Sequence, residues 1–141
     1  ISESKLIIRF HPEENIALHK PFISKKNGLI INPNNNIYEL LNASDMVISL
    51  HSTVGLEAII LDKPLLLIDY YKSELVDYAK RNAAFKVESP NNLHKSIKKL
   101  LYNNSERKKL AENRKIYRDI SNLNELNSAG NCAKLIKSLK L

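Results

Sequence analysis

The sequence predicts an α/β domain built on a doubly wound, mostly parallel sheet. Short apolar runs that fit strands alternate along the chain with segments whose apolar residues recur at helical spacing. Two of these runs, at 46–50 and 65–68, are nearly continuously apolar, which is typical of strands covered by helices on both faces. Because helices that join parallel strands make right-handed crossovers, the alternation favours a twisted sheet with helices on both sides.

The first 44 residues are predicted to contain two strands and a helix. The strands are expected at 5–10 and 29–31, and each is followed closely by a proline, which has no N–H for a strand ladder. Apolar residues at helical spacing then indicate a helix over 37–44. Either Asn35 or Asn36 is its expected N-cap.

The segment 45–70 has the clearest pattern in the chain: strand, polar turn, helix and second strand. The first strand ends near Ser49, and the apolar spacing changes from that of a strand to that of a helix after Ser52. Thr53 and Glu57 share one face of this helix, one turn apart. The apolar residues of another face are Val54, Ala58 and Leu61.

The C-terminal half is predicted to add one strand and four helices. A helix is expected to start at Ser73, and a weaker strand at 85–87 is placed toward the edge of the sheet. The next helix begins at about Asn91, and Ser105 is the expected cap of the helix after it. A last helix is expected near 129–139.

Length and composition exclude several classes of protein. With 141 residues and 43% hydrophobic content, the chain fits one domain with a core, and it has no apolar run long enough to cross a membrane. The single cysteine, Cys132, cannot form an internal disulfide. Because the chain begins with Ile1, we expect it to be processed or cut from a longer protein, and a cytoplasmic setting is the default.

The net charge is +7, and much of the excess lies between 95 and 115. A basic surface of this kind suits an anionic partner, such as lipid headgroups, nucleic acid or a phosphorylated substrate. The alternative is a solvated helix face with no specific partner.

The turn at His51, Ser52 and Thr53 is the main candidate site. It follows a strand and opens a helix, and the free N–H groups of a helix start favour phosphate or carboxylate. The alternative for Ser52 and Thr53 is ordinary N-capping, which would explain one of them. Gly55, in the first turn, would let a ligand or a neighbouring part of the chain approach closely. The chain contains no glycine-rich phosphate loop.

Glu57 and His11 are further candidates for the same rim. Glu57 lies on an otherwise apolar helix, so its carboxylate needs a partner, which could be ribose hydroxyls, a salt bridge or solvent. His11 follows the first strand and can donate to a phosphate or act as an acid or base, or else have a structural role. The histidines show no metal-ligand spacing, so no metal site is expected.

Four stretches and the tail carry a recognisable family pattern. They are Arg9–Pro12, Ile37–Asp45, Ser49–Ala58, Lys63–Pro64 before a hydrophobic strand, and Asn127–Ile136. Together they resemble the C-terminal, nucleotide-sugar-binding domain of GT-B glycosyltransferases. The most similar groups are CDP-glycerol glycerophosphotransferases, bacterial sialyl- and polysialyltransferases, and UDP-N-acetylglucosamine 2-epimerases. The resemblance covers most of residues 5–137.

The resemblance implies a single Rossmann-like nucleotide-binding domain over 1–141, as a fragment of a two-domain enzyme. In these families the His-Pro histidine and the Ser/Thr turn contact the donor phosphate, and an acid on the following helix binds ribose. Carried over, this implicates His11, Ser52, Thr53 and Glu57, and a cytidine donor, CMP- or CDP-linked, is slightly favoured over UDP.

The implied partners are a nucleotide-sugar, as substrate, and a cell-surface glycan or lipid-linked acceptor. Neither a cofactor nor nucleic acid is expected, and the basic helices suggest contact with anionic lipid at the inner face of the membrane. The family's N-terminal acceptor domain and its first central strand are not found in this sequence. We therefore expect a strand to be missing between those that carry His11 and Ser52, and donor binding without turnover, with no catalytic residue identified.

Two rival functions remain at this stage. The first is an epimerase-type reaction on UDP-N-acetylglucosamine, which uses the same donor cradle. The second is a non-catalytic module whose basic helices over 91–121 dock on membrane or nucleic acid.

Overall fold

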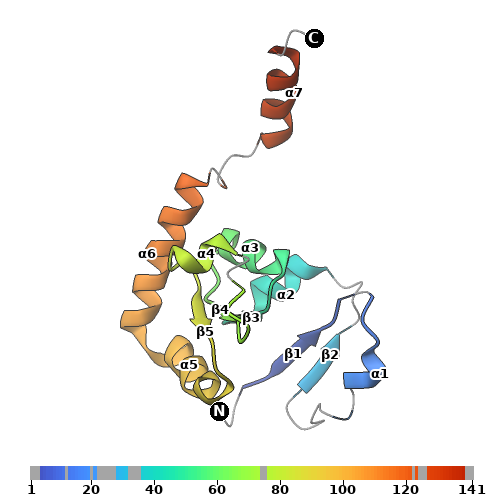
Figure 1. The fold of residues 1–141 in the computed structure, drawn as a ribbon, viewed down its shortest axis with the longest axis vertical. Coiled ribbons are helices and arrows are strands. Elements are labelled where there is room, and N and C mark those ends of the chain that lie inside the picture. The colour runs from blue at the N-terminus through green and yellow to red at the C-terminus, as the bar shows by residue number, and fades with distance from the viewer. Residues whose placement is uncertain are drawn as a thin grey trace. The chain divides into compact units, whose positions relative to one another are not determined.

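The computed structural model describes residues 4–11, 13–19, 21, 28–31, 36–73, 76–121, 123 and 127–138. Its contacts divide the chain into two compact units, residues 1–40 and 41–141, and each is described here by itself. Figure 1 shows the elements of both units.

The first unit contains a two-stranded parallel sheet. Strand β1 (Leu6–Arg9) pairs with β2 (Gly28–Ile31), with Leu6 opposite Gly28 and Arg9 opposite Ile31. The short helix α1 (Ile16–His19) lies between them in sequence. The ring of His19 stacks on that of Phe10, with centroids 4.7 Å apart, and Phe10 is a buried residue of this unit. Both predicted strands are confirmed.

Helix α2 (Ile37–Ala43) follows, where the spacing of apolar residues predicts it. The side-chain oxygen of Asn36 accepts a hydrogen bond from the Tyr38 N–H at 3.0 Å, so Asn36 caps the helix. The other candidate cap, Asn35, lies outside the described residues.

The second unit contains a three-stranded parallel sheet in the order β3-β4-β5 (Figure 1). Its strands are β3 (Val47–Ser49), β4 (Leu65–Ile68) and β5 (Phe85–Val87). The helices are α3 (Thr53–Ile60), α4 (Asp77–Lys80), α5 (Pro90–Tyr102), α6 (Asn104–Ile120) and α7 (Ser128–Ser138). The described strands thus form two parallel sheets, one in each unit, and the strand expected to be missing between those that carry His11 and Ser52 stays a prediction.

Helices cover both faces of this sheet, as the apolar strands predict. Leu66 of β4 packs in a core cluster with Leu100 of α5 and Leu110 of α6. Leu65 points to the opposite face, because side chains alternate along a strand, and its Cδ2 lies under the first turn of α3 near Gly55. Each such buried leucine contributes roughly 1.5–3 kcal/mol to folding.

Two helix starts differ from the prediction. Helix α4 begins at Asp77 rather than at Ser73, because the Ser73 N–H and hydroxyl both bond to the carboxylate of Asp69. Helix α6 is capped by Asn103, whose side chain accepts from the Glu106 N–H at 3.1 Å, so Ser105 already lies inside the helix. At α6, Asn103 thus makes the capping hydrogen bond that the sequence predicts for Ser105.

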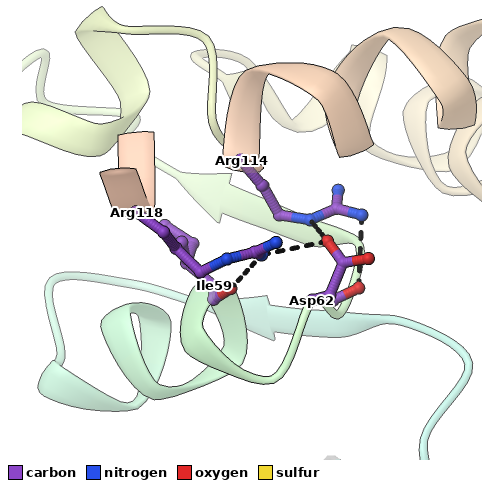
Figure 2. A network of polar contacts seen from close by, with 4 residues as sticks. All are labelled: Ile59, Asp62, Arg114 and Arg118. Carbon is purple, nitrogen blue, oxygen red and sulfur yellow. Dashed lines mark hydrogen bonds and ion pairs between the residues drawn. The ribbon is translucent and has the colours of Figure 1, made fainter. Parts of the chain in front are cut away.

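The C-terminal end of α3 is held by two arginines of α6 (Figure 2). Arg114 Nε donates to the Asp62 carboxylate at 2.9 Å, and Arg118 Nη1 donates to the Ile59 carbonyl at 2.9 Å and to Asp62 at 3.2 Å. Asp62 adopts a left-handed conformation with φ 55°, which ends the helix. Cations at this end of a helix also stabilise its dipole, so α6 fixes the orientation of α3.

Burial shapes the chemistry of this link. The Arg114 side chain is 4% exposed, and burial lowers its pKa while the Asp62 carboxylate raises it in opposition. Charge-assisted hydrogen bonds of this kind contribute about 1.5–3 kcal/mol each.

In the part of the chain that the structure describes, no helix is long and apolar enough to cross a membrane.

Candidate functional site

The candidate site begins at the N-terminus of α3. Ser52 is the N-cap, with extended backbone, and its hydroxyl oxygen accepts from the Val54 N–H at 3.3 Å. Ordinary N-capping, the alternative that would explain one of Ser52 and Thr53, therefore applies to Ser52. Thr53 is the first helical residue and is exposed, and the first turn of α3 contains no acidic residue. This leaves an open, electropositive helix end beyond the carboxyl end of β3.

His51 is held in place by two residues that follow the neighbouring strand β4. Its Nε2 lies 2.8 Å from the Ser73 hydroxyl and 3.5 Å from the carboxylate of Asp69. The carboxylate also accepts from the Ser73 hydroxyl at 3.0 Å and from the Ser73 N–H at 2.9 Å. The Asp69 side chain is only 1% exposed, so solvent screens its charge little and the carboxylate interacts strongly with these neighbours.

This arrangement follows from parallel strand pairing. His51 lies just after β3 and Asp69 directly after β4, and the carboxyl ends of parallel strands meet at one edge of a sheet. A buried carboxylate is an acceptor only, so it favours a proton on Nε2 of His51. Nδ1 is then the ring nitrogen that these contacts leave for a ligand.

A hollow of about 360 Å³ opens beside the helix start. His51, Ser52 and Thr53 line it together with Leu56 of α3, Val76 and Tyr78. The structure thus brings three of the predicted residues to one concave surface. A mainly apolar hollow with a few convergent polar groups is typical of sites for small ligands.

Gly55 lies beneath this hollow, against Tyr78. A Cβ placed on Gly55 would collide with the Tyr78 hydroxyl and would lie 3.0 Å from its Cζ. Of the two approaches proposed for this glycine, by a ligand or by the chain, the structure shows the second. Tyr78 is 5% exposed, and its hydroxyl has no hydrogen-bond partner among the described residues.

Burial raises the pKa of the Tyr78 hydroxyl, with a further increase from Tyr117, whose ring lies edge-on at 6.4 Å. An unpaired buried hydroxyl costs about 1–3 kcal/mol. The Tyr78 hydroxyl is therefore packed against the first turn of α3 without a compensating hydrogen bond among the described residues.

Glu57 does not line the hollow. Its side chain is half-buried, and its Oε2 atom is buried with no hydrogen-bond partner among the described residues. Neither the predicted salt bridge nor a solvent-facing carboxylate describes this oxygen. A buried, unpaired carboxylate oxygen is unfavourable unless something binds it.

His11 belongs to the first unit and is described there alone. It is exposed, its N–H donates to the Glu14 carboxylate at 2.8 Å, and its Nδ1 accepts from the Glu13 N–H at 3.3 Å. These contacts fix the turn after β1. Its predicted contact with a donor phosphate stays a prediction.

Two residues of the site were not predicted from the sequence. For Ser73 the sequence predicts a helix start rather than a site residue, and Tyr78 carries no signal, because nothing local indicates that its hydroxyl reaches the first turn of α3. Asp69 did carry one: it is a carboxylate directly after a buried strand, at the edge where His51 lies. Among the described residues, no group of three or more His, Cys, Asp or Glu side chains is arranged to hold a metal ion.

Comparison with known proteins gives one match. The protein-family model described as CDP-Glycerol:Poly(glycerophosphate) glycerophosphotransferase matches residues 2–138. No curated protein and no solved structure matches the chain.

Proposed function

Because this chain belongs to the CDP-glycerol:poly(glycerophosphate) glycerophosphotransferase family, we propose that it is the donor-binding part of a transferase that uses CDP-glycerol. The family description names glycerophosphate as the transferred group, which refines the sugar donor expected from the sequence. It also agrees with the preference for a cytidine donor over UDP. The proposed acceptor is a poly(glycerophosphate) chain, as part of a surface or lipid-linked glycan.

The proposed reaction is a phosphoryl transfer. An acceptor hydroxyl oxygen attacks the phosphorus that carries glycerol, the bridging P–O bond to CMP breaks, and CMP leaves as the new phosphodiester forms. The hydroxyl proton passes to a base, and no described residue is assigned that role. Negative charge grows on the leaving phosphate, and preorganised donors there lower the barrier.

The observation that carries the proposal is the hollow at the start of α3. The open helix end and the hydroxyls of Ser52 and Thr53 are donors for the leaving phosphate. His51 adds a donor at Nδ1 when its ring is protonated, and the buried Asp69 carboxylate supplies the countercharge. The unpaired Oε2 of Glu57 is proposed to accept from a ribose hydroxyl, and His11 is proposed as a further phosphate ligand on the strength of the resemblance.

The test is a thermal-shift titration with CDP-glycerol, CDP, CMP, UDP and GDP. The wild type is expected to be stabilised most by CDP-glycerol and CDP, by about 2.7 kcal/mol when the ligand is at 100 times its Kd. Thr53→Val, which keeps the cap of α3 and removes one hydroxyl, should weaken binding. Ser105→Ala is the matched control, since Ser105 also lies in the first turn of a helix but far along the chain from the hollow.

The outcome decides between the candidate functions. A shift with UDP alone would favour the epimerase-type reaction on UDP-N-acetylglucosamine. The absence of a shift with every nucleotide would remove the donor-site proposal. Equal loss of binding in Thr53→Val and Ser105→Ala would show that the effect is not local to the hollow.

The two-domain GT-B arrangement, with one more central strand, is proposed on the resemblance and on the edge of β3. The Val47 N–H donates to the Pro64 carbonyl at 2.8 Å, on the β4 side. Because backbone groups alternate in direction, the Ile48 N–H points to the other edge, where no described strand pairs with it. In a longer form of the enzyme, hydrogen exchange of the Ile48 amide should slow markedly, and unchanged exchange would refute the extra strand.

A further inference from the structure

A second hollow, the β5–α5 groove, has a wall in which lysines outnumber acids. It has a volume of about 580 Å³ and lies between the end of β5 and the first half of α5. Four lysines and one acid, Glu88, contribute to its wall. The lysines are Lys72, Lys86, Lys95 and Lys99.

Only two of these lysines have an acidic partner among the described residues. Lys86 Nζ lies 2.7 Å from the carboxylate of Glu88. Lys99 Nζ lies 2.9 Å from that of Glu106, and 5.3 Å from the centre of the Phe85 ring. No ion pair of Lys72 or Lys95 with a described acid is found, so the groove carries surplus positive charge.

The state of Glu88 agrees with that surplus. The hydrogen bond from Lys86 lowers the pKa of the Glu88 carboxyl most, and the charge of Lys86 lowers it next. Lys72 adds a smaller decrease, while desolvation and the Asp69 carboxylate act in the opposite direction. Lys72 therefore acts on the groove although it comes from the segment after β4.

Neutral donors complete the groove wall. Ser89 is the N-cap of α5, and its side chain makes no capping hydrogen bond. Asn92, Lys95, Ser96 and Lys99 lie at i, i+3, i+4 and i+7, so they share one face of α5. The positive end of the 13-residue helix α5 adds to their field.

The groove and the donor hollow lie at the same edge of the sheet. Lys72 is adjacent in sequence to Ser73, which contacts His51, and Ser89 follows β5 as His51 follows β3. A chain lying in the groove would therefore run along the edge at which the donor phosphate is proposed to bind.

We propose that the β5–α5 groove binds a phosphodiester-bearing chain, namely a stretch of the poly(glycerophosphate) acceptor distant from its reacting end, while the reacting end belongs to the N-terminal acceptor domain that the resemblance implies. The inference rests on the proposed function for the identity of the chain, while the anion-binding character rests on the lysines alone. A concave groove fits a narrow chain better than a flat lipid surface. Its one aromatic residue, Phe85, lies under Lys99, so no stacking platform for nucleic-acid bases is offered.

The test measures binding of a fluorescently labelled glycerol phosphate oligomer by anisotropy. The groove variant Lys72→Ala/Lys95→Ala should weaken binding roughly tenfold, from the loss of two exposed lysine–phosphate contacts. The slope of log affinity against log salt concentration should fall by roughly 1.4, as for two fewer phosphate contacts on a flexible chain. The control variant Lys98→Ala/Lys115→Ala removes the same charge from exposed positions that do not line the groove.

Equal weakening in both variants would overturn the proposal, because net charge alone would then explain binding. Binding to phosphatidylglycerol vesicles without binding to the soluble oligomer would also overturn it, in favour of a lipid surface. The nucleotide thermal shift, measured on the same samples, separates the two proposals. If no nucleotide shifts the melting temperature of the wild type, the donor-site proposal is refuted. If nucleotides do shift it but the oligomer does not bind, only the groove proposal is refuted.

Discussion

The packing of Gly55 against Tyr78 leads to a specific prediction about the first turn of α3. Gly55→Ala puts a methyl group against the Tyr78 hydroxyl and 3.0 Å from its Cζ, in a buried site. Overpacking of this kind costs about 1–3 kcal/mol. Alanine in a helix gains about 1 kcal/mol over glycine. The variant should therefore lose about 1 kcal/mol of stability, although propensity alone predicts a gain.

Tyr78→Phe is expected to have the opposite effect on stability from Gly55→Ala. It removes a buried hydroxyl that has no partner among the described residues, so by itself it should leave the free energy of unfolding unchanged or raise it by about 1 kcal/mol. It also removes the atom that the new methyl group meets first. In the Tyr78→Phe background, Gly55→Ala should cost less, with a coupling energy of about 1–2 kcal/mol.

The assay is urea unfolding of the four proteins in this double-mutant cycle, followed by circular dichroism, with slopes compared as well as midpoints. Additive effects, within about 0.5 kcal/mol, would refute the packing argument. Nucleotide binding gives an independent check. If Gly55 is needed for packing and not for ligand approach, the double variant keeps its thermal shift with CDP, and loss of that shift would restore the ligand role.

Three further predictions concern stability. Asp62→Asn should cost about 2 kcal/mol of folding stability, because it leaves a buried guanidinium without its countercharge. Arg114→Met should cost less, because the carboxylate that it leaves unpaired is half-exposed. Equal urea midpoints for the two variants would contradict this asymmetry. Because the pKa of Tyr78 is raised above 10.0 in the folded state, the unfolded chain loses this proton first. Folding stability should therefore fall as the pH rises above about 10. The fall should be smaller in Tyr78→Phe, and the melting temperature measured against pH checks this. Asn103→Ala should cost about 1 kcal/mol by loss of the α6 cap, whereas Ser105→Ala should change the urea midpoint little, and the reverse order would show that the cap lies at Ser105.

The sequence was most informative where structure depends on neighbours in the chain. The nearly continuous apolar run at 65–68 predicts a strand buried on both faces, and Leu65, Leu66 and Leu67 are each at most 1% exposed. The change of period after Ser52 predicts that a helix starts there, and the structure shows α3 beginning at Thr53. Both signals are local, since periodicity and capping are set within one or two turns of chain.

Local patterns in the sequence did not predict which polar side chains bind the backbone at two helix starts. Ser73 and Ser105 are both good N-cap residues by type, yet Asp69 binds the first and Asn103 replaces the second. The choice depends on which side chain reaches the free N–H groups in three dimensions. Residue preference alone cannot decide it, because the preferences of Ser, Asn and Asp are nearly equal.

Hydrophobic periodicity and parallel topology are enough to predict the order of strands and helices and the edge of the sheet at which the candidate site lies. Which side chains meet at that edge depends on tertiary packing. His51 meets Ser73 across 22 positions, and Arg114 meets Asp62 across 52. Lys72 likewise joins α5 in the β5–α5 groove. Such contacts depend on how strands and helices pack, and no local pattern in the chain encodes them.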